Sequence, residues 1–424
     1  MPKHFIAARS FINGYMHILF LTQILPYPPD SGPKVKTWHV LKYLSNQGYR
    51  ITLVSFVRSE EEPFVENLKE YCFQIHAIPL KRSRLLDIGY LLRSYFSGRP
   101  FLVERDDSAA MRSLIREVVA SDPVDAIHAD QLTMAQFALP YRNRNGKPVL
   151  IFDAHNAVWT IVERLNATLP MYYRIPLIFE AGRVKAYEAR IVHEFSRTLA
   201  VAEPDARALR EALKEQYPAI PVEEVPIRVI PIAVDMETAH LIQPLAGSFN
   251  ILTMGTLYYP PNADGIRWFL LDVFPIVRRA LPQATLTIVG KTPPADFLQA
   301  AKESNGSIVV TGYVPKLDPY YANASIAVIP VRAGGGMRVR ILEAFARGMP
   351  VVTTTVGLEG IDAKPGSDVL VADSPNDFAQ SIIQLLSDGE LQARLSANGR
   401  RLAKEKYDWQ VVLRQLEEMY QSLA

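Results

Sequence analysis

Short apolar runs alternate with longer amphipathic stretches along the chain from Met16 onward. The first run, 18–22, is followed by a Pro-rich loop and then by apolar residues that recur every three positions, namely Val35, Trp38, Leu41 and Leu44. This spacing places them on one helix face, and Gly48 follows where helices commonly end. Strands that alternate with helices predict parallel βαβ units and therefore an α/β fold.

The alternation occurs in two series. Strands are expected at 18–22, 51–57, 73–78, 126–129, 149–154 and 198–201 in the first series, and at 227–231, 250–254, 285–289, 308–311, 326–330, 351–354 and 369–372 in the second. A segment with three prolines, 217–226, separates them and resembles a linker. We therefore expect a disordered leader at 1–15, an N-terminal domain at 16–216 and a C-terminal domain at 227–408, followed by a last helix at 409–424.

Length and composition narrow the protein class. A chain of 424 residues suits two or three domains, and 49% hydrophobic with 21% charged residues is typical of a globular protein. Lys and Arg number 46 against 44 Asp and Glu, so bulk charge does not indicate nucleic-acid binding. The single cysteine, Cys72, excludes an intramolecular disulfide and favours a cytoplasmic location. No run approaches the about 18 apolar residues of a membrane span, so any membrane contact is expected to be peripheral.

The strongest candidate for chemistry is the segment 328–352, in which an apolar strand runs into three glycines and then into a helix. Glycines let backbone N–H groups approach a ligand, and a helix N-terminus adds the positive end of its dipole. This combination predicts a phosphate site made by Gly334, Gly335, Gly336, Met337, Arg338 and Arg340. Glu343, one turn further on, is a candidate acceptor of hydrogen bonds from sugar or ribose hydroxyls. The alternative is a flexible turn followed by a surface ion pair between Arg340 and Glu343.

Two further loops follow strands and are candidates for substrate contact. The loop 28–36 contains Gly32, where the backbone is able to approach a substrate closely, although a rigid proline turn explains the same residues. The loop 254–262 contains Gly255 and Thr256 at the matching place in the second series. It lacks the G-x-G-x-x-G spacing of nicotinamide-binding proteins.

Polar side chains end two neighbouring strands of the first series: His128 with Asp130, and Asp153 with His155. Side chains at the carboxyl ends of parallel strands are expected to face a ligand, which favours substrate contact. A structural role for the histidines is the alternative. Their spacing matches no recognised metal-ligand set, so we predict no metal site.

The segment 81–105 carries six basic and two acidic residues, a net charge of +4, interleaved with apolar residues. Such a segment is able to hold a helix at an anionic membrane surface. The alternative, which the sequence slightly favours, is a helix that packs its apolar side on the core and exposes its basic side.

Taken together, these motifs resemble the retaining glycosyltransferases of family four, which have the GT-B fold. The resemblance runs from Met16 to Ala424 and rests on 26–32, 229–235, 254–256, 288–290, 311–313 and, above all, 338–352 with Leu342-Glu-Ala-Phe. It implies two Rossmann-like domains facing across a cleft, with the last helix crossing back to the N-terminal domain. It also implies that an enzyme of the hexosyl-transferring type moves a sugar, with retention of configuration, from a nucleotide-diphosphate sugar to a glycan, lipid-linked saccharide or small molecule. No metal or other cofactor is implied.

Departures from the family pattern concern the donor site. Gly335 stands where members commonly carry the first of two glutamates, of which Glu343 is the second. Tyr258 and Tyr259 occupy a place where many members have a basic pair, so Arg338 and Arg340 are assigned to the diphosphate. The family's His-x-His reads His128-Ala-Asp130, which leaves the sugar contact to Asp130 or His155. Two alternatives remain: a nucleotide-sugar epimerase of the same fold, and a non-catalytic partner subunit.

Overall fold

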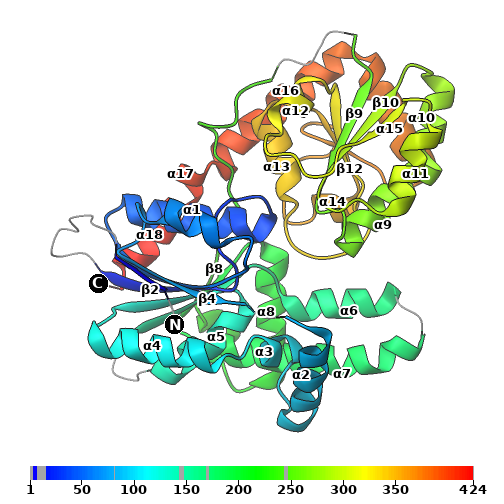
Figure 1. The fold of residues 1–424 in the computed structure, drawn as a ribbon. Helices are drawn as coiled ribbons and strands as arrows, with labels where there is room; N and C mark the ends of the chain where they lie inside the picture. Colours follow the sequence, from blue (N-terminus) through cyan, green and yellow to red (C-terminus); the bar gives the residue numbers. More distant parts are fainter. Residues whose placement is uncertain are drawn as a thin grey trace. The chain divides into compact units, whose positions relative to one another are not determined.

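The computed structural model describes residues 3–6, 16–80, 82–142, 148–168, 171–242 and 247–423. The chain divides into two compact units, of which unit 1 comprises Met1–Pro231 and Leu413–Ala424 and unit 2 comprises Ile232–Val412. The end of the chain therefore returns to unit 1, as the sequence predicts, and the change of unit falls at Leu413 rather than at residue 409. Both units are α/β (Figure 1).

Unit 1 is built on an eight-stranded sheet in the order β1-β4-β3-β2-β5-β6-β7-β8, parallel except for β1. Its strands are β1 (Lys3–Ile6), β2 (His17–Thr22), β3 (Arg50–Val57), β4 (Gln74–Pro79), β5 (Ala126–Asp130), β6 (Val149–Ala154), β7 (Arg197–Ala200) and β8 (Ile227–Val229). All residues of β2, β5 and β6 are buried, because helices cover both faces of a parallel sheet. This double burial explains why these strands appear in the sequence as continuous apolar runs.

The helices of unit 1 connect successive strands and flank the sheet. They are α1 (Gly32–Asn46), η1 (Glu62–Leu68), α2 (Arg84–Ser97), α3 (Phe101–Arg105), α4 (Ala109–Ser121), α5 (Leu132–Ala138), η2 (Leu139–Tyr141), α6 (Val158–Thr168), α7 (Met171–Glu194), α8 (Glu203–Gln216), η3 (Val222–Glu224) and α18 (Arg414–Gln421). A core cluster joins apolar residues of β2, β5 and β6 to those of α4, α5, α7 and α8.

Two expectations at the ends of the first series need correction. Strand β8 was expected to open the second domain, but it pairs with β7 in parallel, so the segment 217–226 lies within unit 1 and the change of unit follows Pro231. Within the expected leader, β1 pairs antiparallel with β4. The rest of the leader, like Lys81, lies outside the described residues.

The expected packing of 81–105 is wrong for α2. Of its 14 residues only Ser94 is buried, and most of its large apolar side chains are exposed. The opposite side of α2 contacts the segment that follows it. Ser94 Oγ donates to the carbonyl of Arg99, and Ser97 Oγ donates to Glu104 of α3. No helix in the described part of the chain is long and apolar enough to cross a membrane.

Unit 2 has a six-stranded parallel sheet in the order β11-β10-β9-β12-β13-β14. Its strands are β9 (Asn250–Met254), β10 (Thr285–Val289), β11 (Ile308–Val310), β12 (Ile326–Ile329), β13 (Val351–Thr353) and β14 (Leu370–Val371). Its helices are α9 (Pro260–Trp268), η4 (Phe269–Val273), α10 (Phe274–Ala280), α11 (Ala295–Glu303), α12 (Asp318–Ala322), α13 (Val339–Ala346), α14 (Thr355–Leu358), α15 (Pro375–Ser387), α16 (Gly389–Leu402), η5 (Ala403–Tyr407) and α17 (Trp409–Val412). Strands β9, β10 and β12 lie at the centre of the unit (Figure 1).

Each sheet reverses its strand order once, between β2 and β5 in unit 1 and between β9 and β12 in unit 2. Ligands of open α/β sheets bind at the carboxyl ends of the strands on either side of such a reversal. The topology therefore selects four loops as candidates. Two follow β2 and β5, and two follow β9 and β12.

Candidate functional site

The loop after β12 changes direction at two glycines. Gly334 and Gly336 have φ values of +106° and +77°, a conformation that side chains other than glycine rarely adopt. A Cβ built on Gly334 would lie 3.5 Å from the Pro261 side chain, so this loop runs over the first turn of α9. Arg338 occupies the N-cap position of α13, and its Nη1 donates to the carbonyl of Gly335 at 2.5 Å. The predicted glycine loop and the predicted helix start are thus joined by an arginine side chain.

Arg340 and Glu343 form the ion pair that the sequence offered as an alternative. Nη1 of Arg340 donates to Oε2 of Glu343 at 2.5 Å, and both side chains are largely buried. The pair orients the Glu343 carboxylate and neutralises Arg340. Arg338 is held instead by the loop backbone, through its hydrogen bond to the carbonyl of Gly335.

Two other predicted residues of this region serve the packing of unit 2. Met337 is buried, and its Sδ accepts a hydrogen bond from the backbone N–H of Ile232 at 3.5 Å. The backbone carbonyl of Thr256 accepts from Asn262 Nδ2 at 3.2 Å, which ties the loop after β9 to α9. A Cβ on Gly255 would lie 3.0 Å from the same Nδ2, so the loop is closely packed where it leaves the strand.

A glycine that the sequence did not single out as a site residue completes this edge of the sheet. A Cβ on Gly290, directly after β10, would lie 1.9 Å from the carbonyl oxygen of Gly255. Its N–H donates to the carbonyl of Gly312 at 3.0 Å. The loops after three neighbouring strands are therefore in backbone contact. In the sequence, Gly290 was noted only as part of the motif Ile288-Val-Gly290, and its contacts with the neighbouring loops were not predicted.

In unit 1, polar residues from β5, β6 and α1 form a buried network. Oδ1 of Asp130 lies 2.8 Å from Nε2 of His155, and Oδ2 of Asp130 accepts from Thr37 Oγ1 at 2.9 Å. Asp153 forms a short ion pair with Lys36, and both side chains are almost completely buried. Two residues that the sequence named as separate candidates, Asp130 and His155, are thus in contact. Asp153 was expected at the end of its strand, but its pairing with Lys36 was not predicted.

The charge of Asp153 depends on its neighbours. Burial alone would raise the pKa of this carboxyl group, but the Lys36 ammonium, together with His128 and His155, holds the pKa well below its usual value. One ligand atom each of His128, Asp130 and Asp153 lies within 4.8 Å of the others. Lys36 and Thr37 already contact the carboxylates of this group. The arrangement is therefore a charge-compensated polar cluster.

His128 lies inside unit 1 rather than at its surface. Its ring stacks on Phe20 with centroids 4.3 Å apart, and its Nδ1 lies 2.7 Å from the hydroxyl of Tyr420 on α18. Its Nε2 is 3.4 Å from Asp153 Oδ2. The last helix of the chain therefore reaches the polar network through Tyr420, a link that the sequence gave no sign of.

The loop after β2 leads directly into α1, whose first residue is Gly32. Pro33 lies in the first turn, as the proline-turn interpretation predicts. Lys34 Nζ lies 2.7 Å from Glu61 Oε1, which ties the start of α1 to the chain just before η1. Lys36, two residues on, is the side chain of this loop that reaches the network around Asp153.

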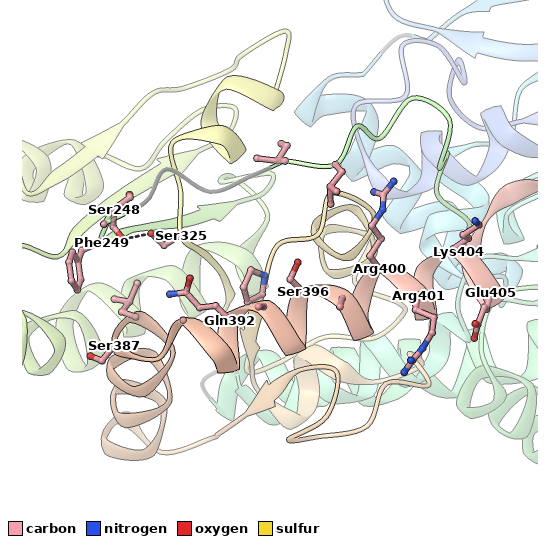
Figure 2. Close-up of a pocket in the computed structure, with 18 residues that line it drawn as sticks. Ser248, Phe249, Ser325, Ser387, Gln392, Ser396, Arg400, Arg401, Lys404 and Glu405 are labelled. Carbon is pink, nitrogen blue, oxygen red and sulfur yellow. Dashed lines mark hydrogen bonds between the residues drawn. The ribbon is translucent and has the colours of Figure 1, made fainter.

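A cavity of unit 2 is at a different place. It has a volume of about 1060 Å³ and is lined by Ser248, Ser325 and Pro350, which directly precede β9, β12 and β13. Figure 2 shows Gln392, Ser396 and Arg400 of α16 along this cavity, with a hydrogen bond between Ser325 and Ser248. The cavity is therefore at the amino ends of the strands, away from the glycine loop.

Comparison with known proteins gives a consistent result. The profile of the family "Glycosyl transferases group 1" matches residues 248–388, which contain the glycine loop and α13. An uncharacterized 44.6 kDa protein in the cps region of Klebsiella pneumoniae is 22% identical over 92% of this chain and 96% of its own length. A GDP-mannose-dependent phosphatidylinositol monomannoside mannosyltransferase of Mycolicibacterium smegmatis is 29% identical over 33% of this chain and 40% of its own.

Among solved structures, Anabaena HepE in complex with UDP and glucose superimposes with a TM-score of 0.69 and 15% identity. The match covers 96% of this chain and 100% of that protein. At this level of identity the likeness establishes the fold. It covers both units.

Proposed function

Because the chain belongs to the glycosyl transferases group 1 family and has the GT-B fold, we propose that it transfers a sugar from a nucleotide-diphosphate sugar to an acceptor, with retention of configuration. The observation that supports the donor site best is the loop from Gly334 to Arg338, which follows β12 at the strand-order reversal and opens into α13. Backbone N–H groups at a helix start and an arginine side chain suit the diphosphate of such a donor.

In this proposal Arg338 acts as an electrostatic catalyst. As the bond between sugar and diphosphate breaks, negative charge grows on the leaving phosphate oxygen. A fixed guanidinium and oriented N–H groups stabilise that charge without having to reorganise during the reaction. Glu343, oriented by Arg340, accepts hydrogen bonds from hydroxyl groups of the donor.

We propose that unit 1 binds the acceptor near Asp130 and His155. The hydrogen bond between these two side chains, at 2.8 Å, fixes their orientation at the carboxyl ends of β5 and β6. His155 is 7% exposed and Asp130 is fully buried, so His155 is the member of the pair nearer to solvent. His128, which is stacked and fully buried, supports the network from the inside.

The acceptor is proposed to be a glycan or lipid-linked saccharide of a polysaccharide pathway. The names of two relatives support this, since one lies in a cps region and the other acts on a phosphatidylinositol monomannoside. A cytoplasmic protein that contacts the inner membrane face peripherally through 82–105 fits such an acceptor. The exposed apolar residues of α2 favour that contact.

Turnover with a panel of UDP-, GDP- and ADP-sugars tests the proposal. Purified protein with a matching donor and acceptor is expected to release the nucleoside diphosphate and form a glycoside with the anomeric configuration of the donor, as read by NMR. Arg338→Ala should slow this reaction, whereas Arg279→Ala, on an exposed position of α10, should not. An altered sugar nucleotide formed from the donor alone would instead identify an epimerase, and failure to bind any nucleoside diphosphate would indicate a non-catalytic subunit.

A further inference from the structure

Helix α2 exposes an apolar stripe that no described part of the protein covers. Six of its large apolar side chains fall on one side of the helix at a spacing of three or four residues, and each is more than half exposed: Leu85, Ile88, Leu91, Leu92, Tyr95 and Phe96. Leu85 and Phe96 are 82% and 83% exposed. Exposed apolar surface of this extent on one helix marks a contact with another molecule or a membrane.

Helix α7 also exposes apolar residues. Ile178 and Phe179 are 57% and 67% exposed, and both line a groove of about 580 Å³ that also includes 97–100 at the end of α2. Nine of the nineteen exposed large apolar residues in the described part of the chain therefore belong to these two helices. The groove therefore lies between the end of α2 and the exposed apolar residues of α7.

The same groove is basic. Arg99, Arg183 and Arg190 line it, and the last two share one face of α7 with Phe179. Arg99 is paired with Glu104 and Asp107. Arg183 and Arg190 form no ion pair with an acid among the described residues. The charge of Arg183 acts on the Glu180 carboxylate, which accepts a hydrogen bond from the backbone N–H of Phe101.

A buried polar group also lines the groove. Tyr187 is 8% exposed, and its hydroxyl has no hydrogen-bond partner among the described residues. A buried hydroxyl without a partner costs free energy unless a ligand or water supplies one. Two arginines, this hydroxyl and an apolar rim together form a site for an anionic group attached to an apolar chain.

We infer that α2 and α7 bind an anionic lipid bilayer, with the stripe of α2 in the interface between headgroups and acyl chains and a lipid phosphate in the groove at Arg183, Arg190 and Tyr187. The charges support this occupant. Arginine binds phosphate through parallel N–H donors, and an amphipathic helix with basic flanks lies in the plane of such an interface. The inference adds a lipid-phosphate site to the peripheral contact proposed above, and it does not depend on sugar transfer.

Sedimentation with lipid vesicles tests the inference without any donor. The full-length protein is expected to bind vesicles of phosphatidylcholine with phosphatidylglycerol at least ten-fold more tightly than vesicles of phosphatidylcholine alone. The double variant R183Q/R190Q should bind the anionic vesicles about thirty-fold more weakly, because each basic residue near such a surface contributes about five-fold in affinity. The matched control R279Q/R401Q removes two exposed arginines of unit 2 and should bind as the wild type does.

A second pair of variants tests the stripe. L92E/F96E places charges at two exposed positions, so the protein should fold with an unchanged melting temperature and lose binding to both kinds of vesicle. L271E, at a position of unit 2 that is 69% exposed, is its control and should bind normally. Wild-type protein that binds no vesicles, or L92E/F96E that binds normally, would overturn the inference. Equal binding by wild type and R183Q/R190Q would overturn the phosphate site.

Discussion

At the residue scale, the buried ion pair of Lys36 and Asp153 is expected to be sensitive to substitution. Removing one partner of a buried pair leaves the other charge without compensation, which typically costs about 3 to 5 kcal/mol. An exposed pair such as Lys69 and Glu66 contributes about 0 to 1 kcal/mol. Both are pairs of a lysine with an acidic residue, so their different contributions to stability follow from burial and not from residue type.

We therefore predict that Lys36→Met lowers the free energy of unfolding by about 3 to 5 kcal/mol at pH 7, and Lys69→Met by less than about 1 kcal/mol. The pH dependence should also change. In the wild type the pKa of Asp153 is lowered, so its stabilisation is lost as pH falls below about 4. In Lys36→Met burial dominates and the pKa is raised, so the variant should regain stability as pH falls from 7 to 4.5. Urea unfolding at both pH values measures this, and equal losses at the two values would contradict the account.

Some of the candidate site residues could be predicted from the sequence, and some of their contacts could not. The glycine loop with Arg338, and the pair of Asp130 and His155, were predictable because each motif directly follows an apolar strand. The contact of His128 with Tyr420 was not predictable, because it depends on the packing of a helix residue 292 positions further along the chain. The ion pair of Arg340 with Glu343 could be predicted as an alternative, because the two residues are three positions apart on one helix.

At the element scale, the start of α6 depends on carboxylates from two other helices. Glu188 of α7 accepts hydrogen bonds from the backbone N–H groups of Val158 and Trp159 at 2.8 and 2.9 Å, and Asp205 of α8 accepts from Ala157. Burial raises the pKa of Glu188 to about 8, opposed by the two backbone donors and supported by the charge of Asp205. The folded protein therefore retains a proton that the unfolded chain releases at a lower pH.

We predict from this pKa that Glu188 makes the wild type less stable as pH rises from about 5 to about 8. Glu188→Gln should remove this part of the pH dependence, although the amide, with a single acceptor oxygen, lowers stability at pH 5. Urea unfolding across the range gives the slopes. Identical slopes in wild type and variant would show that Glu188 does not retain the proton.

The contact between the loops after β9 and β10 gives a second prediction at this scale. Gly290→Ala would place a Cβ 1.9 Å from a backbone oxygen, so it should lower the melting temperature of the protein. Gly389→Ala is the matched control, because no atom lies within 4 Å of its Cβ and alanine favours the helix that starts there. Differential scanning calorimetry compares the two. A stable Gly290→Ala protein would disprove the close packing of the loops.

Most strands were predictable because burial on both faces makes them continuous apolar runs. The strands β6, β9 and β10 have the expected bounds, and most others differ by one residue at an end. Helix α2 was misjudged for the same reason. Its apolar residues resemble those of a core helix in sequence, and only the fold shows that they face solvent.

At the scale of the whole molecule, the chain returns to unit 1 through α18. Tyr43 of α1 donates to Glu417 at 2.7 Å, and Tyr420 contacts His128 at the same distance. Both interactions join residues that are far apart in sequence. The sequence predicted the return only through the family resemblance, and β8 was assigned to the wrong unit because a short apolar strand does not reveal its pairing partner.

We predict that a chain ending at residue 412 loses stability in unit 1, because it exposes the apolar side of α18 and leaves His128 without its partner. A chain ending at residue 421 keeps both contacts and should melt as the full protein does. Hydrogen exchange of amides in β5 and β2 distinguishes the two. Unchanged protection in the shorter chain would show that α18 is not needed by unit 1.

At the same scale, the proposed function requires that the loop from Gly334 to Arg338 binds the diphosphate of a sugar nucleotide. Isothermal titration calorimetry with UDP, GDP and ADP tests it most directly. At least one nucleotide is expected to bind the wild type, and Arg338→Ala should bind it about ten- to a hundred-fold more weakly, the effect of losing a charge-assisted hydrogen bond. Arg279→Ala should bind with wild-type affinity. Equal affinity in Arg338→Ala and wild type would contradict the claim.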